Sequence, residues 1–302
     1  MDRFELTYGA VRRMLVALPT LLFVASLLMA VQSRGLESSI SAYYGGPLRD
    51  LFVGVLIATA VCLLAYRGES LVERYNLQGA AVYLLVVALV PTGLGQILDD
   101  LRTNFVLSPD GVSPDEYVWA LRISVTLVVA LCALVFWRRF RSGALRAGDG
   151  WARAFIVVTL GVLAAFLVFM LWQLWVPSVG EVRLGGVELL GRQFTIHDIA
   201  AILFVCALVV AVWSHGWPHA SARREGSLAS HDEVRVQARY RWIAAAMVLG
   251  PVGIWAASSL WLPGYFVLLV EWWEIAFFSA FWVLETRRLG TGQPAPGVRR
   301  SR

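Results

Sequence analysis

The sequence predicts an all-α fold, a polytopic transmembrane helical bundle of about eight spans with both termini cytoplasmic. Hydrophobic residues make up 58% of the 302 residues and charged residues only 16%, whereas soluble domains are ~45–50% apolar. Apolar runs close to the ~20 residues that cross a bilayer recur along the chain. Arginines gather in alternate loops between these runs. Together these observations leave no room for a separate soluble domain.

Eight candidate spans can be placed between residues that are typical of turns. We expect them at 14–32, 51–66, 78–97, 118–137, 154–176, 196–214, 242–262 and 264–284. Leu262-Pro263-Gly264 predicts a tight turn between the last two spans. Pro91 lies within the third span, where a kink is tolerable if neighbouring helices satisfy the freed carbonyl.

Segments outside the spans carry some order of their own. A Gly-Gly pair in 182–189 predicts a short hairpin. Ser230 and Glu233 have the spacing of a capping box, which predicts a helix that begins just after Ser230. We expect residues 1–289 to form a single transmembrane domain. The tail 290–302, rich in Gly, Pro and Arg, is expected to be disordered.

The distribution of arginine predicts the orientation. All 26 basic residues are arginine, a bias that we attribute to genome composition rather than to nucleic-acid binding. Twenty of them lie in the N-terminal tail, in loops 67–77, 138–153 and 215–241, and in the C-terminal tail. Because arginine-rich loops stay inside, we expect a multi-pass protein of a bacterial cytoplasmic (inner) membrane with both ends in the cytoplasm. Its expected partners are membrane lipids, and no nucleic acid.

Ionisable residues within the spans are the first candidates for function, because burying a charge in a bilayer is costly. In the assigned orientation they gather in the outer half of the bilayer, and the cytoplasmic half holds nothing comparable. Glu271 and Glu274 share one helix face at i, i+3 spacing. The complete set of candidates is Arg122, His197, Asp198, Glu271, Glu274, Asp50, Asp99 and Asp100.

Two interpretations of these charges remain open. They could line an outward-facing polar cavity that binds a ligand, or Arg122 could neutralise an acid and merely lock the bundle. An arginine at that depth needs a counter-charge, since an unpaired one costs ~2.5–3.5 kcal/mol. We therefore expect Arg122 to contact Glu271 or Asp198.

Histidines and cysteines give little sign of a metal site. His215 and His219 are four residues apart, but Pro218 between them breaks a helix, and both lie on the cytoplasmic side, away from the acids. Only His197 is placed for chemistry, and it is the one candidate metal ligand, although a single histidine makes a poor zinc site. We expect no cofactor. We interpret the cysteines as packing residues: Cys62, Cys132 and Cys206.

Four segments near the start of the chain form a recognisable pattern. They are Ser39-Ile-Ser-Ala-Tyr-Tyr44, Arg49-Asp50-Leu-Phe-Val-Gly54, Leu64-Ala-Tyr-Arg-Gly68 and Ala88-Leu-Val-Pro-Thr92. The pattern covers under a fifth of the chain and resembles a group of uncharacterised bacterial multi-pass membrane proteins. The resemblance implies a shared architecture. It also marks a signature loop that contains Ser39, Ser41, Tyr43, Tyr44 and Arg49.

The chain is also distantly similar to the ceramidase and progestin-receptor-like membrane hydrolases, which use a serine, an aspartate and three histidines around zinc. That similarity would give two of these roles to Ser39 or Ser41 and to Asp50. The sequence departs from the family because it lacks the paired intramembrane histidines. Without an enzyme, the tyrosines of the signature loop suit the interfacial aromatic belt, and its serines can cap the approach to the next helix.

The residues leave three classes of function open. No catalytic signature names a reaction, and the Gly-x-Ser-x-Gly elbow of serine hydrolases is absent, so we lean against an enzyme. We expect binding or transport of a small amphiphile or ion through an outward-facing polar cavity. The alternatives are a metal-dependent membrane lipid hydrolase (ceramidase-like) and a non-catalytic membrane scaffold or partner subunit.

Overall fold

The fold is all-α apart from one short hairpin, as the sequence predicts. The computed structural model describes residues 3–33, 35–45, 48–66, 68, 70–107, 111, 113–141, 150–176, 186–189, 192–216 and 231–290. Its helices are α1 Arg3–Gln32, the short 3-10 helix η1 Ile40–Gly45, α2 Arg49–Ala65, α3 Leu71–Leu89, α4 Leu94–Leu107, α5 Pro114–Arg141, α6 Gly150–Trp175, α7 Ile196–Gly216, α9 His231–Trp261 and α10 Phe266–Gly290. The strands are β1 Val187–Leu189 and β2 Arg192–Phe194.

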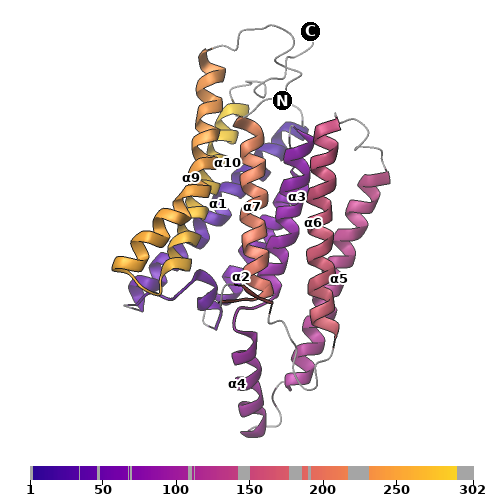
Figure 1. Cartoon of the computed structure of the whole chain (residues 1–302), viewed down its shortest axis with the longest axis vertical. Helices are drawn as coiled ribbons and strands as arrows, with labels where there is room; N and C mark the ends of the chain where they lie inside the picture. The colour runs from indigo at the N-terminus through magenta and orange to yellow at the C-terminus, as the bar shows by residue number, and fades with distance from the viewer. Residues whose placement is uncertain are drawn as a thin grey trace. The chain divides into compact units, whose positions relative to one another are not determined.

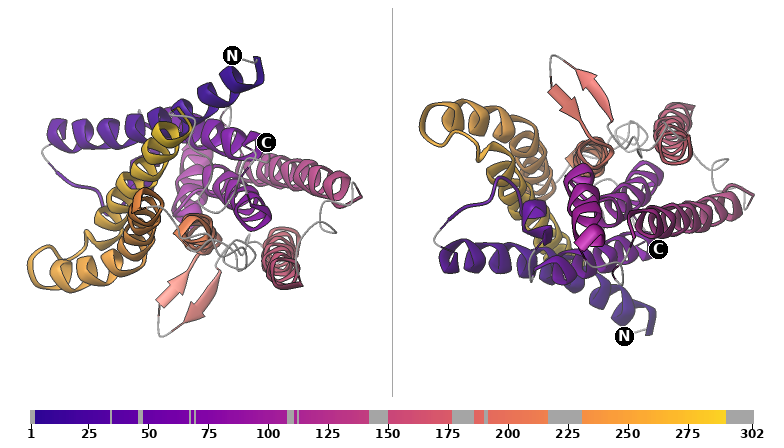
Figure 2. Two further views of the ribbon diagram at one scale, coloured as in Figure 1. Left: turned by 90° about the horizontal axis from the view of Figure 1, so that it is seen from above. Right: turned by 90° about the horizontal axis from the view of Figure 1, so that it is seen from below.

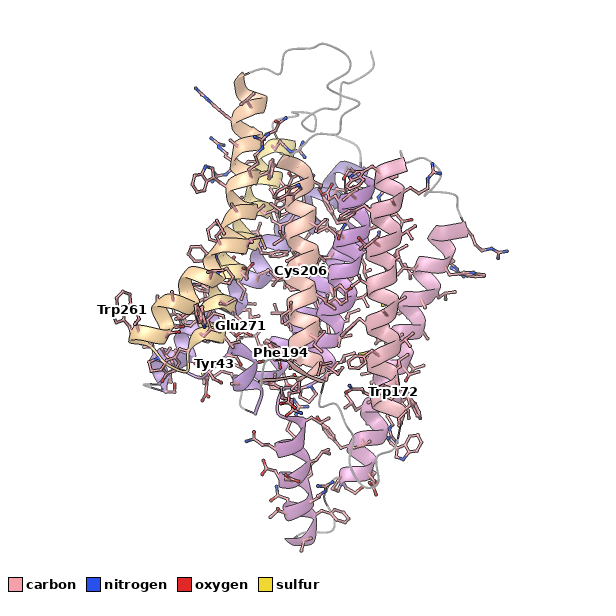
Figure 3. All side chains as sticks on the ribbon, viewed as in Figure 1. Tyr43, Trp172, Phe194, Cys206, Trp261 and Glu271 are labelled. Atoms are coloured by element: carbon pink, nitrogen blue, oxygen red, sulfur yellow. The ribbon has the colours of Figure 1, made fainter. Side chains whose placement is uncertain are left out.

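Seven helical segments are long and apolar enough to cross a membrane. Their outer surfaces carry large apolar side chains that a soluble protein would bury: Trp242, Leu260 and Trp261 are each at least 75% exposed. Figure 3 shows Trp261 at the tip of the α9–α10 hairpin and Trp172 on the outer side of α6. Surfaces of this kind face lipid, which confirms a multi-pass membrane helical bundle.

Seven of the eight expected spans overlap these segments. The remaining one, expected at 51–66, is α2, which has 17 residues. That length is at the lower limit of the ~17–25 residues of transmembrane helices. The exact number of spans therefore stays a prediction, as does the side on which the termini lie.

The third helix differs from its expected form at Pro91. We expected a single span over 78–97, but α3 ends at Leu89 and α4 begins only at Leu94. Pro91 has no amide hydrogen to continue the helix, and Gly93 has a φ of +67°, which is outside the helical region. Proline therefore ends this helix and does not kink it.

Clustering of backbone contacts divides the chain into two compact units. Unit 1 comprises Met1–Ala81 and Val205–Arg302, and unit 2 comprises Val82–Phe204. In unit 1, α10 packs against α1 and α9, and α1 also packs against α2 (Figure 1). In unit 2, α5 packs against α4 and α6.

Two predicted turns have different outcomes. The tight turn after α9 is confirmed: the N–H of Tyr265 donates to the carbonyl of Leu262 at 3.3 Å, and Gly264 has a φ of +96°. The hairpin expected at 182–189 is displaced. Its strands are β1 and β2, which pair antiparallel with Val187 opposite Phe194 (Figure 2), so the segment expected to be the second strand is the first.

The remaining local predictions concern the edges of the described chain. Helix α9 begins at His231, which confirms the predicted start. Ser230, its expected cap, and the tail 291–302 lie outside the described residues.

Candidate functional site

A cluster of buried ionisable side chains lies where the start of α3, the end of α7, the first third of α9 and the end of α10 meet in unit 1. Each of its members is 6% exposed or less. We call it the His215 cluster, and it consists of Glu73, His215, Tyr240, Glu285 and Arg288. The expectation that buried charge gathers only at the opposite helix ends is therefore wrong.

Glu73 is fixed by a capping box at the start of α3. The backbone N–H of Glu73 donates to Ser70 Oγ at 3.0 Å, and the N–H of Ser70 donates to Glu73 Oε2 at 3.4 Å. These bonds satisfy helix donors that have no partner within the helix. The other carboxylate oxygen, Oε1, lies 3.6 Å from His215 Nε2.

His215 is oriented by its own helix. Its Nδ1 is 3.1 Å from the carbonyl of Ala211, one turn earlier. Because a carbonyl only accepts, Nδ1 carries the hydrogen in this bond. Nε2, on the other side of the ring, lies at ion-pair distance from two carboxylate oxygens, 3.4 Å from Glu285 Oε1 and 3.6 Å from Glu73 Oε1, without a hydrogen bond to either.

Glu285 has partners on two helices. The hydroxyl of Tyr240 on α9 donates to Glu285 Oε1 at 2.5 Å. Arg288, one turn further along α10, donates from Nη2 to Glu285 Oε2 at 2.8 Å. Charged hydrogen bonds of this kind are stronger than neutral ones, so they hold the carboxylate in one place.

Aromatic rings surround the cluster and keep it in an apolar environment. The ring of Phe281 lies 5.4 Å from the His215 ring and 6.0 Å from the Tyr240 ring, both edge to face. Tyr66 stands edge to face on Trp282 at 4.8 Å. Such surroundings strengthen the attraction between opposite charges and raise the cost of an uncompensated one.

The cluster brings groups of opposite charge together. Arg288 is always charged, and it pairs with Glu285. Nε2 of His215 lies at ion-pair distance from two carboxylate oxygens, so a proton on His215 would be attracted by both acids. The geometry therefore places one ionisable imidazole beside two carboxylates, from α3, α7 and α10.

The signature pattern reaches this cluster through its third segment. A Cβ at Gly68 would lie 2.8 Å from Glu73 Cδ and 2.9 Å from the backbone nitrogen of Arg74. Arg74 in turn donates to the carbonyl of Gly68 at 3.3 Å. Only glycine lets the chain pass this close to the acid, which gives the Gly68 of the pattern a physical role.

Arg122, the arginine expected to need an acid, has other partners within unit 2. Its Nε donates to the carbonyl of Leu174 at 2.9 Å. Its guanidinium lies between the rings of Trp119 and Trp175, 5.5 Å from each centroid. The predicted contact with Asp198 is wrong, because a carbonyl and two indole faces take the place of a counter-charge.

Asp198 and His197 have local roles at the start of α7. Thr195 donates to Asp198 Oδ2 from its N–H at 2.9 Å and from its hydroxyl at 2.7 Å, and the N–H of Asp198 returns a bond to the hydroxyl. His197 is buried, and its Nδ1 is 2.7 Å from the carbonyl of Val90. It thus satisfies a carbonyl exposed where Pro91 ends α3.

Glu271 holds the signature loop in place. Its Oε2 accepts the N–H of Ile40, the first residue of η1, at 2.6 Å. Ser39 caps the same helix, with its hydroxyl 3.0 Å from the N–H of Ala42 and 2.9 Å from the hydroxyl of Ser41. Figure 3 shows Tyr43 and Glu271 at this end of unit 1. The loop is therefore anchored by an acid that sequence analysis assigned to a cavity.

The remaining candidates lie at exposed helix positions. Asp50 is in the first turn of α2, where a negative charge favours the helix dipole. Asp99 pairs with Arg102 at 3.0 Å, and Asp100 beside it is exposed. Arg49 is exposed as well, while the side chain of Tyr44 lies outside the described part of the chain. Asp50, Asp99 and Asp100 therefore lie at the surface and not in a buried site.

Sequence analysis missed the His215 cluster although one signal was present. Ser70 and Glu73 have capping-box spacing immediately before an apolar run, which would have placed Glu73 at the start of α3. The partners of Glu73 are more than 140 residues away along the chain, so no spacing rule connects them. His219 and Pro218 lie outside the described residues.

The fold and the cluster together define a multi-pass membrane protein with a buried cluster of ionisable side chains. Among the described residues, no group of three or more His, Cys, Asp or Glu side chains is arranged to hold a metal ion. Comparison with protein-family models, curated proteins and solved structures finds no match to this chain.

Proposed function

We propose that this chain is a multi-pass protein of the bacterial cytoplasmic (inner) membrane that binds or transports a small ion or amphiphile, with the His215 cluster as its proton-handling centre. One observation carries the proposal. An imidazole nitrogen lies within 3.4–3.6 Å of carboxylate oxygens from two other helices, and all three groups are buried in segments long enough to cross a membrane. Ionisable residues in such positions are rare and mark ion pathways and proton relays.

The arrangement favours a relay over a purely structural lock. Glu285 and Arg288 lie on one helix and already neutralise each other. A purely structural ion pair therefore needs no further charged side chain. His215 and Glu73 add an imidazole and a second acid from two more helices. Nε2 of His215 lies at nearly equal distances, 3.4 and 3.6 Å, from two carboxylate oxygens, and two alternative partners for one proton are what a relay requires.

The arginine distribution supports a cytoplasmic location for this centre. The cluster adjoins loops 67–77 and 215–241, two of the arginine-rich loops. Reporter fusions test the orientation: fusions after residues 145, 228 and 295 should report cytoplasm, and fusions near 110 and 185 should report the exterior. Reversal of either group would place the cluster on the other side.

The predicted outward-facing cavity remains part of the proposal in a narrower form. Most residues expected to line it have hydrogen-bond partners within the protein or lie at the surface. Glu274 is the exception, since it is buried and its oxygens accept no hydrogen bond from the described residues. A ligand path on that side would therefore involve Glu274.

The proposed function can be tested by measuring proton movement in vesicles. The purified protein is reconstituted into vesicles of phosphatidylethanolamine and phosphatidylglycerol that contain a pH-sensitive dye, and a potassium diffusion potential drives the flux. We expect His215→Gln and Glu73→Gln to abolish the protein-dependent flux.

His197→Gln is the matched control for the first variant. It removes the other described buried histidine of α7, and glutamine can still donate to Val90, so flux should be retained. Gel filtration and thermal unfolding confirm that each variant is folded. A folded His215→Gln protein with normal flux, or no flux from the folded wild type, would contradict the relay.

A further inference from the structure

Helix α10 carries three glutamates, and they differ in how their carboxylates are satisfied. Glu271 accepts a backbone N–H, and Glu285 accepts hydrogen bonds from a tyrosine and an arginine. Glu274 is 7% exposed, and neither of its oxygens has a hydrogen-bond partner among the described residues. A buried carboxylate without a partner is so unfavourable that such a group takes up a proton or a cation.

Two of the helices that pack against α10 supply no counter-charge at this level. The stretch of α9 from 242 to 261 and the stretch of α1 from 14 to 32 contain no ionisable side chain. On α7, the thiol of Cys206 is close enough to interact electrostatically with Glu274, and it is exposed. Figure 3 shows Cys206 about midway along α7. A thiol offers no positive charge, so it does not stabilise an ionised Glu274.

Glu274 lies on the same stripe of α10 as the His215 cluster. Glu274 and Glu285 are eleven residues apart, which on an α-helix means ~16 Å along the axis and about 20° around it. Phe278 and Phe281 occupy the stripe between them, 5% and 1% exposed. Two buried acid sites thus follow one helix face, separated by two aromatic rings.

We propose that Glu274 is a second proton-binding site, separate from the His215 cluster and embedded in the apolar middle of α10. This inference rests on the proposed function in one respect, since it names the proton as the ion that is handled. The carboxyl group is held neutral by its proton, and Phe278 and Phe281 separate it from Glu285.

A hydrophobic carbodiimide tests this site directly, because it enters the membrane and reacts with protonated carboxyl groups. The acid O–H adds across one C=N bond of dicyclohexylcarbodiimide: the oxygen bonds to the central carbon and the proton goes to nitrogen. The acyl group then migrates from oxygen to nitrogen and leaves a stable N-acylurea, with nothing released. Peptide mass spectrometry of the full-length protein in vesicles locates the adduct.

We expect the adduct on Glu274, loss of that adduct in Glu274→Gln, and its retention in Glu271→Gln. Labelling should fall as the pH is raised and should not change when sodium replaces choline at fixed pH. Absence of the adduct from folded wild-type protein at acidic pH would overturn the site. Protection by sodium would overturn its assignment to a proton, because a metal cation would then occupy the carboxylate.

The two proposals fail in distinguishable ways. Missing label with a His215-dependent proton flux would remove the Glu274 site and leave the proposed function standing. Label on Glu274 without any flux from the wild-type protein would support the proton site and contradict the relay.

Discussion

Two acid–arginine pairs in this chain have the same i, i+3 spacing and nearly the same length, yet they lie in opposite surroundings. Asp99 and Arg102 on α4 are 3.0 Å apart, with side chains 73% and 45% exposed. Glu285 and Arg288 on α10 are 2.8 Å apart and at most 4% exposed. The first pair has water as an alternative partner for each charge, and the second has only protein.

The difference shows that helical spacing brings the two charges together, whereas burial decides how much the pair contributes to stability. An exposed pair contributes little, because solvent screens it. A buried pair cannot lose one member without leaving an uncompensated charge. Arg122 represents a third arrangement, in which a carbonyl and two indole rings replace the acid. The following predictions test this ranking.

The largest effect is expected from Glu285→Gln. The substitution leaves Arg288 buried without its carboxylate, and breaking a buried pair destabilises by ~3–5 kcal/mol. Thermal and denaturant unfolding in detergent measure the loss. The double variant Glu285→Gln/Arg288→Gln removes both charges and should recover much of it. If Glu285→Gln were as stable as the wild type, the buried pair would contribute no more to stability than the exposed pair Asp99–Arg102.

Gly68→Ala should have the next largest effect. Its Cβ would lie 2.8 Å from the Glu73 side chain and 2.9 Å from backbone, and overpacking of this kind costs ~1–3 kcal/mol. The same unfolding measurements apply. Gly54→Ala is the matched control in the signature pattern, because nothing lies within 4 Å of its Cβ, and alanine favours a helix interior by ~0.5–1 kcal/mol. Equal effects at the two glycines would show that Gly68 does not position Glu73.

Arg122→Gln is expected to destabilise by ~0.5–2 kcal/mol, the range of a cation between aromatic rings. Because Asp198 is not its partner, Arg122→Gln/Asp198→Asn should equal the sum of the single changes within ~0.3–0.5 kcal/mol. A double-mutant cycle in detergent gives the coupling. A coupling well above that limit would restore the ion pair that the sequence predicted.

Asp99→Asn should have the smallest effect. Exposed pairs within a helix contribute ~0.3–0.5 kcal/mol, and added salt should reduce this further. Unfolding at low and high salt measures the difference. A loss as large as that of Glu285→Gln would mean that α4 is not surrounded by solvent, and the contrast between the two pairs would disappear.

Sequence patterns with a local cause were predicted well. The apolar runs gave the positions of seven membrane-length helices, and Pro263-Gly264 gave the turn between α9 and α10. Predictions from local sequence failed where one sequence pattern is compatible with two different structures. Proline within an apolar run either kinks or ends a helix, and at Pro91 the chain ends it. The hairpin was expected around Gly185-Gly186, but the strands pair on either side of 190–191.

The candidate sites show the limit of prediction from sequence more clearly. The sequence by itself determined that this chain is a bundle of apolar helices with ionisable residues in them, because hydropathy and helix periodicity are local properties. Only the tertiary structure decided which of those residues matter. It gave Glu271, Asp198 and His197 backbone partners, left Glu274 with none among the described residues, and joined His215 to Glu73 and Glu285. The role of a charged residue in a membrane depends on the groups that contact it, and those groups come from helices that lie far apart in the sequence.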